Sequence, residues 1–231
     1  MSVSSFPLGL SNLSSSQKIS LVKQFLHFFL YNTGQFPDFS LLMNKEISKY
    51  SSNDSLGSLK KLTSCIEDIS VIEKELSRLS NFKIDQFLFV LGPNALKPVR
   101  MVLLNFHHCH SMEENDCQSS IDPRFSIFFR YLIESPYFSS IFGETSPTRL
   151  QLYFKADRTF RCDDFIPKEA FKPSIKCTHV LNAVLSAEDT MELSSCDRPS
   201  PSTELDDLPV QYFLEGGDNI WFSCSRIITG C

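Results

Sequence analysis

The sequence predicts an α+β domain, and three observations favour this fold class. Apolar residues recur every three or four positions between residues 59 and 79, which is the spacing of an amphipathic helix. Two short runs rich in Phe, Val and Leu, at residues 87–91 and 99–106, have the length and composition of buried strands. After Gly143 apolar and polar residues alternate, as they do in strands. Since helices and strands do not alternate regularly along the chain, a parallel nucleotide-binding sheet is not expected.

Composition excludes several classes of protein. The chain has 231 residues, of which 42% are hydrophobic and 21% charged, so it can form a packed core and suits one large domain. The net charge of −5 provides no basic surface for nucleic acid. No apolar run approaches the ~18 residues of a membrane span, and the N-terminus has no secretory signal pattern. The eight cysteines form no compact framework, so we expect reduced thiols in the nucleus or cytoplasm.

The N-terminal part is predicted to consist of a flexible lead followed by a helix. Residues 1–16 are rich in Ser and are expected to be a flexible lead, whereas residues 17–231 are expected to form the domain. The spacing of apolar residues predicts a first helix at 17–32, with Ser15 or Ser16 as its N-cap. A Gly and a Pro follow closely and end this helix.

The later part of the chain is predicted to contain one more helix and then strands. The third helix covers residues 122–134, and one further turn follows with Ser135 as its cap and Pro136 at its first position. Residues 187–209 are acidic and rich in Ser and Pro, so we expect a disordered insertion there. The predicted strands are residues 149–156, 177–186, 210–215 and 219–228, and a hairpin turn at 216–218 joins the last two.

The segment between the two buried runs is a candidate phosphate loop, but its residues argue against that role. A loop of the Walker type needs a second Gly, then Lys and Ser or Thr, and then a helix. Here Gly92 stands alone, Pro93 lacks a backbone N–H, and a strand follows. We therefore expect a strand–loop–strand connection in which Asn94 occupies the turn.

The candidate metal site is the segment His107–His110, which contains three histidines and Cys109, with Cys117 downstream. Alternate side chains of a strand point to opposite faces, so each face would carry only two of the four neighbouring ligands. Zinc sites in proteins have three or four protein ligands. We therefore expect no bound metal and no cofactor.

A catalytic nucleophile is not evident. The sequence contains no G-x-S-x-G motif. Cys177 and His179 share one face of a predicted strand, where packing or exposure to solvent is the simpler interpretation. The acidic clusters lie in predicted loops and are expected to be solvated. The residues alone thus favour a binding protein over an enzyme.

Four segments, in order along the chain, resemble one protein family. "FLFVLGPNALKP", which follows the long predicted helix, resembles a family segment ending in L-G-G-N-A-L-S-P, although Pro93 and Lys97 differ. "FLYNTGQFP" resembles the end of the family's first helix, "FFRYLIESPYFSSI" its third helix, and "DNIWFSCSRIITG" its C-terminal strand. The family is the comet family, whose members bind the checkpoint protein Mad-two and silence the spindle assembly checkpoint.

The resemblance implies a HORMA-like fold, with a central antiparallel sheet and three helices packed on one face. It implies no catalytic activity. Family members bind the closed conformer of Mad-two at the surface that Mad-two uses to dimerise. They present it to a hexameric AAA+ ATPase, which returns it to the open form. The implied location is the nucleus and cytoplasm, with spindle association in mitosis, and neither nucleic acid nor membrane is an implied partner.

The resemblance also implies site residues. The positions that face Mad-two map to Asn32, where the family has Gln, and to Phe129. The Pro-Lys pair that faces the ATPase maps to Pro167 and Lys168. Helical spacing independently places Phe128 in the core and Phe129 on a flank that a partner can reach, although Phe129 can instead pack against the first helix.

Two alternative functions stay open at this point. One is a metal-dependent hydrolase that uses the His107–His110 segment, which bound zinc would favour. The other is a HORMA protein that clasps a peptide under a mobile C-terminal belt. The sequence ends soon after the predicted strand at 219–228, which leaves little chain for such a belt and favours the adaptor.

Overall fold

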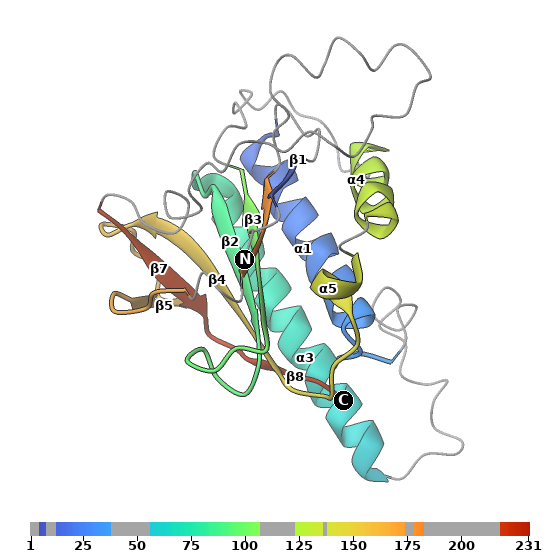
Figure 1. Ribbon diagram of the computed structural model, residues 1–231. Coiled ribbons are helices and arrows are strands. Elements are labelled where there is room, and N and C mark those ends of the chain that lie inside the picture. The colour runs from blue at the N-terminus through green and yellow to red at the C-terminus, as the bar shows by residue number, and fades with distance from the viewer. Residues whose placement is uncertain are drawn as a thin grey trace, which may run out of the picture.

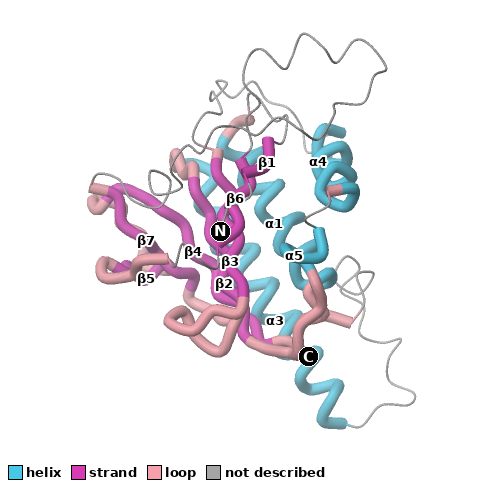
Figure 2. The backbone as a smooth tube through the Cα atoms, in the orientation of Figure 1, coloured by secondary structure: helices cyan, strands magenta, loops and turns pink. Residues whose placement is uncertain are grey.

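In the computed structural model the chain folds into one β-sheet with helices on one of its faces (Figure 1), which confirms the α+β class. Figure 2 shows the strands side by side and the helices together in a separate layer. The structure describes residues 5–7, 13–37, 56–106, 123–135, 138–173, 178–182 and 218–231.

The described strands form an eight-stranded sheet in the order β1-β6-β3-β2-β4-β7-β5, and β8 pairs with β4. Neighbouring strands run antiparallel from β3 to β5. At the other edge β6 runs parallel to β3, and β1 runs parallel to β6. The strands are β1 Ser5–Pro7, β2 Gln86–Leu91, β3 Arg100–Asn105, β4 Arg149–Asp157, β5 Phe165–Lys168, β6 Thr178–Asn182, β7 Asn219–Cys224 and β8 Ile228–Thr229.

The prediction of an antiparallel sheet is therefore correct for its centre and wrong for the β3–β6–β1 edge. The reason is the path of the chain. Strand β5 lies at one end of the strand order and β6 near the other, so the chain crosses the sheet between them. A crossover of this kind permits two strands to lie parallel, whereas a tight hairpin does not.

The helical layer contains the three predicted helices and one shorter helix. Both the first and the second helix begin earlier than predicted, and the third begins one residue late. The further turn, which was predicted to start at Pro136, is helical from Phe138 onward. The helices are α1 Ser15–Asn32, α3 Leu56–Arg78 with a 3-10 turn at Leu79–Asn81, α4 Pro123–Glu134 and α5 Phe138–Phe142.

Helix α1 begins at a different cap from the two that were predicted. Ser14 is the N-cap: its backbone is extended, at φ −65° and ψ 162°, and its hydroxyl accepts a hydrogen bond from the Gln17 N–H. The Gln17 side chain in turn accepts from the Ser14 N–H at 2.9 Å, which completes a capping box. Ser15 and Ser16 are the first two helical residues, so the predicted caps are wrong by one or two positions.

The main core lies between the helices and one face of the sheet. In β2, Phe87 and Phe89 point toward the helices, whereas Leu88 and Val90 point to the opposite face. Phe25 of α1 packs edge-on against Phe89, with 4.9 Å between ring centroids. This alternation follows from the two-residue period of a strand.

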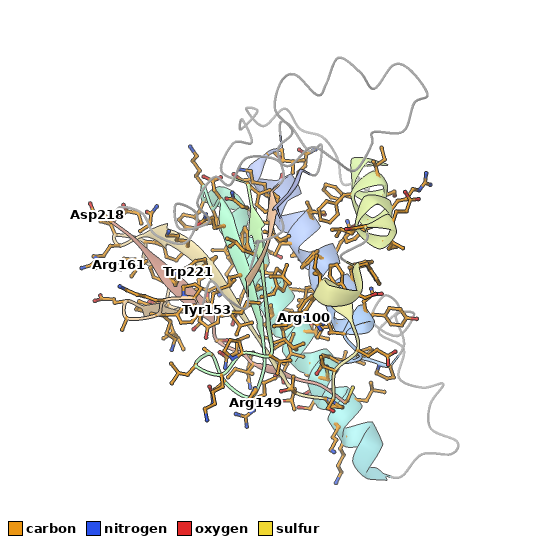
Figure 3. All side chains as sticks on the ribbon, in the orientation of Figure 1. Arg100, Arg149, Tyr153, Arg161, Asp218 and Trp221 are labelled. Carbon is orange, nitrogen blue, oxygen red and sulfur yellow. The ribbon has the colours of Figure 1, made fainter. Side chains whose placement is uncertain are left out.

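The opposite face of the sheet carries a second, smaller apolar cluster. Phe171 stacks on Tyr153 with 4.5 Å between ring centroids and lies edge-on to Trp221 at 6.3 Å. Figure 3 labels Tyr153 and Trp221 in this region. Because both faces of the central strands are buried, β2 and β3 read as continuous apolar runs in the sequence rather than as alternating ones. The cluster consists of Leu88, Val90, Met101, Leu103, Tyr153 and Trp221.

The remaining predictions are wrong for the flexible lead, agree with the structure for three strands, and are untested for the segments outside the described residues. Within the predicted flexible lead, Ser5–Pro7 form β1 and Leu13 is buried, so these residues belong to the folded domain. The predicted strands at 149–156, 177–186 and 219–228 correspond to β4, β6 and β7–β8. The strand at 210–215, the turn at 216–217 and the insertion at 187–209 lie outside the described residues.

Candidate protein-interaction site

The two positions expected to face Mad-two lie on different helices, and Phe28 is a neighbour of both. Asn32 is the last residue of α1, and its side-chain Nδ2 donates to the Phe28 carbonyl oxygen at 2.7 Å. The Phe28 ring, one turn earlier, packs against Phe129 of α4 with 4.9 Å between centroids. Phe28 therefore links Asn32 to Phe129 across the contact between α1 and α4.

Two exposed apolar residues extend this region into a surface. Tyr31 is 46% exposed and lies one turn from Phe28 on α1. Ile133 is 55% exposed and lies one turn after Phe129 on α4. We refer to Phe28, Tyr31, Asn32, Phe129 and Ile133 as the α1–α4 face. Aromatic residues are enriched at the centres of protein–protein interfaces, so this composition suits a protein-binding surface.

Within α4 the two neighbouring Phe residues behave as their spacing predicts. Phe128 is 1% exposed and packs edge-on against Phe25 and Phe129. Phe129 is half-buried and belongs to the rim of the core. The contact of Phe129 with the first helix, which was the alternative interpretation, is present as well. Phe129 thus supports the packing of α4 and still presents part of its ring to solvent.

Pro167 and Lys168 lie elsewhere, on β5. Pro167 pairs with Phe222 and Lys168 with Trp221 of β7, and β5 is the last strand at that edge of the described sheet. A proline is tolerated there because an edge strand can do without one ladder hydrogen bond. Pro167 is exposed and Lys168 half-exposed, and Ile166 beside them is 47% exposed. We call Ile166–Lys168 the β5 edge.

The two candidate surfaces are well separated. Figure 1 shows α4 and the end of α1 on one side of the molecule and β5 at the far edge of the sheet. The sheet and α3 lie between them. The α1–α4 face and the β5 edge therefore do not overlap.

The β2–β3 connection is a loop that Asn94 holds with hydrogen bonds. Asn94 Oδ1 accepts hydrogen bonds from the Leu96 and Lys97 N–H groups at 3.0 and 2.9 Å. Gly92 has φ +154°, and a Cβ atom there would lie 2.8 Å from the Val99 nitrogen, so glycine is required. The predicted strand–loop–strand connection is confirmed, and the loop holds Leu96 91% exposed at its tip.

Gln35 lies in the segment FLYNTGQFP, which resembles the family, and its structural role was not predicted from the sequence. Gln35 is fully buried and joins three segments of the chain. Its Nε2 donates to the Thr33 carbonyl oxygen and the Thr145 hydroxyl, both at 3.0 Å, and its Oε1 accepts from the Thr148 N–H at 2.7 Å. Its own carbonyl oxygen accepts from the Cys231 N–H at 3.1 Å. A single Gln just after a predicted helix was the signal for this junction, but its partners Thr145, Thr148 and Cys231 lie more than a hundred residues away.

The described residues contain no candidate metal-binding group. No three His, Cys, Asp or Glu side chains gather there in a group that would hold a metal ion. The His107–His110 segment, Cys117 and Cys177 lie outside the described residues, so their predicted roles stay predictions. No helix in the described part of the chain has the length and apolar character needed to span a membrane.

Comparison with known proteins adds no further assignment. No protein-family model matches the chain, and no curated protein matches it significantly. The functional interpretation therefore rests on the residues and on the two surfaces described above.

Proposed function

We propose that this protein is a non-enzymatic adaptor that binds the closed conformer of the Mad-two checkpoint protein and presents it to a hexameric AAA+ ATPase. In this proposal the fold is HORMA-like, and the protein silences the spindle assembly checkpoint. It acts in the nucleus and cytoplasm and associates with the spindle in mitosis. The four sequence segments that resemble the comet family are the source of the partners' identity.

One observation carries the proposal: the residues that the resemblance selects fall on two coherent surfaces. Asn32 and Phe129 are 97 positions apart in the sequence, yet both contact Phe28. Asn32 lies one turn after Phe28 on α1, and the Phe28–Phe129 ring contact joins this turn to α4. The α1–α4 face is therefore the surface that we assign to Mad-two.

The β5 edge supports the second half of the proposal. An adaptor that delivers one protein to another needs two surfaces that do not compete. Lys168 offers a positive charge and Pro167 fixes the backbone beside it, which suits an acidic partner surface. We assign this edge to the ATPase because it lies away from the α1–α4 face (Figure 1).

The direct test measures conformer selectivity. Calorimetric titration of the purified protein with Mad-two locked in its closed form should give a one-to-one complex. Titration with Mad-two locked in its open form should give no measurable heat of binding. Equal binding to both conformers, or binding to neither, would remove the proposed function.

A further inference from the structure

Two cysteine side chains meet where the end of the chain packs on α3. Cys65 lies on the inward side of α3 and is 1% exposed. Cys231 follows β8, and the two thiols are joined by a side-chain hydrogen bond. The other two cysteines in the described part of the chain lie beside carboxylates instead: Cys162 beside Asp164, and Cys224 beside Glu75.

The backbone holds Cys231 in this position. Its N–H donates to the Gln35 carbonyl oxygen at 3.1 Å, and the preceding Gly230 N–H donates to the Thr148 carbonyl oxygen at 2.7 Å. The Cys231 Sγ also lies 3.8 Å from the Gln35 carbonyl oxygen. Because these hydrogen bonds fix the main chain at Gly230 and Cys231, the contact with Cys65 is part of a built junction.

The two thiols differ in reactivity. The hydrogen bond from Cys65 lowers the pKa of Cys231, and the positive charge of Lys61 acts in the same direction, although partial burial opposes them. The same hydrogen bond, together with burial, raises the pKa of Cys65. Cys231 is also the more exposed of the two. Since the thiolate is the reactive form, Cys231 is the attacking thiol and Cys65 the resolving one.

We propose that Cys65 and Cys231 form a peroxide-sensitive dithiol whose oxidation links α3 covalently to the segment after β8. The Cys231 thiolate attacks one oxygen of hydrogen peroxide, the O–O bond breaks, and a sulfenic acid and hydroxide result; the hydroxide takes up the proton that Cys231 released and becomes water. Cys65 sulfur then attacks the Cys231 sulfur, the S–O bond breaks, and the second oxygen leaves as water with the Cys65 proton. Two thiols lose two electrons and two protons, and one peroxide becomes two waters.

This modification site is independent of the proposed adaptor function. The cross-link would join α3 to the segment after β8. Gln35, just after α1, already holds this segment, because its carbonyl oxygen accepts a hydrogen bond from the Cys231 N–H. A disulfide that closes a long loop restricts the unfolded chain and stabilises the fold. The oxidised protein should therefore melt about 5–10 °C above the reduced protein, and a dithiol reductant should reverse the shift.

The test uses the full chain with Cys109, Cys117, Cys177 and Cys196 replaced by Ser, because these four lie outside the described residues. After treatment with hydrogen peroxide, mass spectrometry of a non-reduced digest should find the peptides of Cys65 and Cys231 joined, with two hydrogens lost. The rate of linking should rise with pH and reach half its maximum below 9.0, the pKa of an ordinary thiol.

Two variants distinguish the roles. Cys65→Ser should stop the link and leave a sulfenic acid at Cys231 that dimedone traps, with a mass gain on that peptide. Cys162→Ser is the matched control and should leave the link unchanged, because this thiol lies away from the pair. Circular dichroism confirms that each variant is folded, and Cys65→Ala replaces any Cys65→Ser protein that is not. Absence of the link in the folded protein, or faster labelling of Cys162 than of Cys231, would overturn the proposal.

Discussion

Phe128 and Phe129 are consecutive residues of α4, and their different surroundings predict different mutant effects. Phe129 is half-buried on the α1–α4 face, where a large aromatic ring can act as a binding hot spot. We expect Phe129→Ala to weaken binding of closed Mad-two by about 2 kcal/mol, roughly thirtyfold. Since the ring also packs on Phe28, a stability loss of about 1 kcal/mol should accompany it. Titration calorimetry measures the first effect and thermal melting the second.

Two comparisons make this prediction specific. Phe128→Ala should lower the free energy of unfolding by about 3 kcal/mol, because Phe128 is fully buried, and should leave the intrinsic affinity unchanged. Ile127→Ala is the matched surface control. Ile127 is 67% exposed on the same helix, two positions and about 200° away from Phe129. If Ile127→Ala costs as much affinity as Phe129→Ala, the α1–α4 face is not the interface.

The buried Gln35 side chain leads to a second prediction at the scale of one residue. Gln35→Glu keeps the oxygen that accepts from Thr148 but replaces the donor that faces Thr33 and Thr145. We expect a loss of about 2 kcal/mol at neutral pH, since a carboxylate would face carbonyl oxygens.

The sign of its pH dependence follows from the same geometry. The substituted carboxyl group is ionised less readily in the folded protein than in the unfolded chain, so its pKa is raised on folding. The loss in free energy of unfolding is therefore largest above the raised pKa. It shrinks as the pH falls through this pKa, because the protonated carboxyl group donates a hydrogen bond again. Chemical denaturation at several pH values measures this difference. Gln24→Glu, at a half-exposed position of α1, is the control, and its stability difference from wild type should not shrink in this way as the pH falls.

At the scale of elements, the helices were predicted to within a few residues because apolar residues recur at helical spacing. The first residue of α1 could not be predicted from this spacing. Three consecutive serines can each cap a helix, and the periodicity does not choose among them. The Gln three positions after Ser14 does choose, because only this spacing forms a capping box. The signal was present in the sequence, but it lies in the relation between two residues and not in either one.

The contact between α3 and the segment after β7 leads to a third prediction. Glu75 is 5% exposed, and its carboxylate accepts hydrogen bonds from the Ser225 N–H, at 3.1 Å, and from the Ser225 hydroxyl. Glu75→Ala should lower the free energy of unfolding by about 2 kcal/mol, because the Ser225 N–H and hydroxyl lose their charged, buried partner. Denaturant unfolding measures this loss. Glu67→Ala, at an exposed position of the same helix, should change stability by no more than about 0.5 kcal/mol.

At the scale of the whole molecule, the sequence predicted the class of fold better than its topology. Alternation along β4 indicates which residues face a core, but not the direction of a strand relative to its neighbour. The parallel β3–β6–β1 edge therefore could not be read from the sequence. The same limit applies to the site: Asn32 and Phe129 were selected separately, and only the fold brings Phe129 against Phe28, one turn before Asn32. The thiol pair of Cys65 and Cys231 is a product of topology in the same way.

The separation of the two surfaces gives the last prediction, which concerns the whole adaptor. Changing both Pro167 and Lys168 to Ala alters the β5 edge and leaves the α1–α4 face untouched, since the two lie on different sides of the molecule (Figure 1). The double variant should bind closed Mad-two with wild-type affinity but fail to recruit the AAA+ ATPase, so that ATP-driven conversion of closed to open Mad-two falls to the rate without adaptor.

Phe129→Ala should show the reverse pattern, with ATPase binding retained and Mad-two binding weakened. Lys172→Ala, at an exposed position just after β5, is the charge control and should support conversion at the normal rate. Normal conversion by the double variant would mean that the ATPase binds elsewhere. Loss of both partners at once would mean that the two surfaces are not independent.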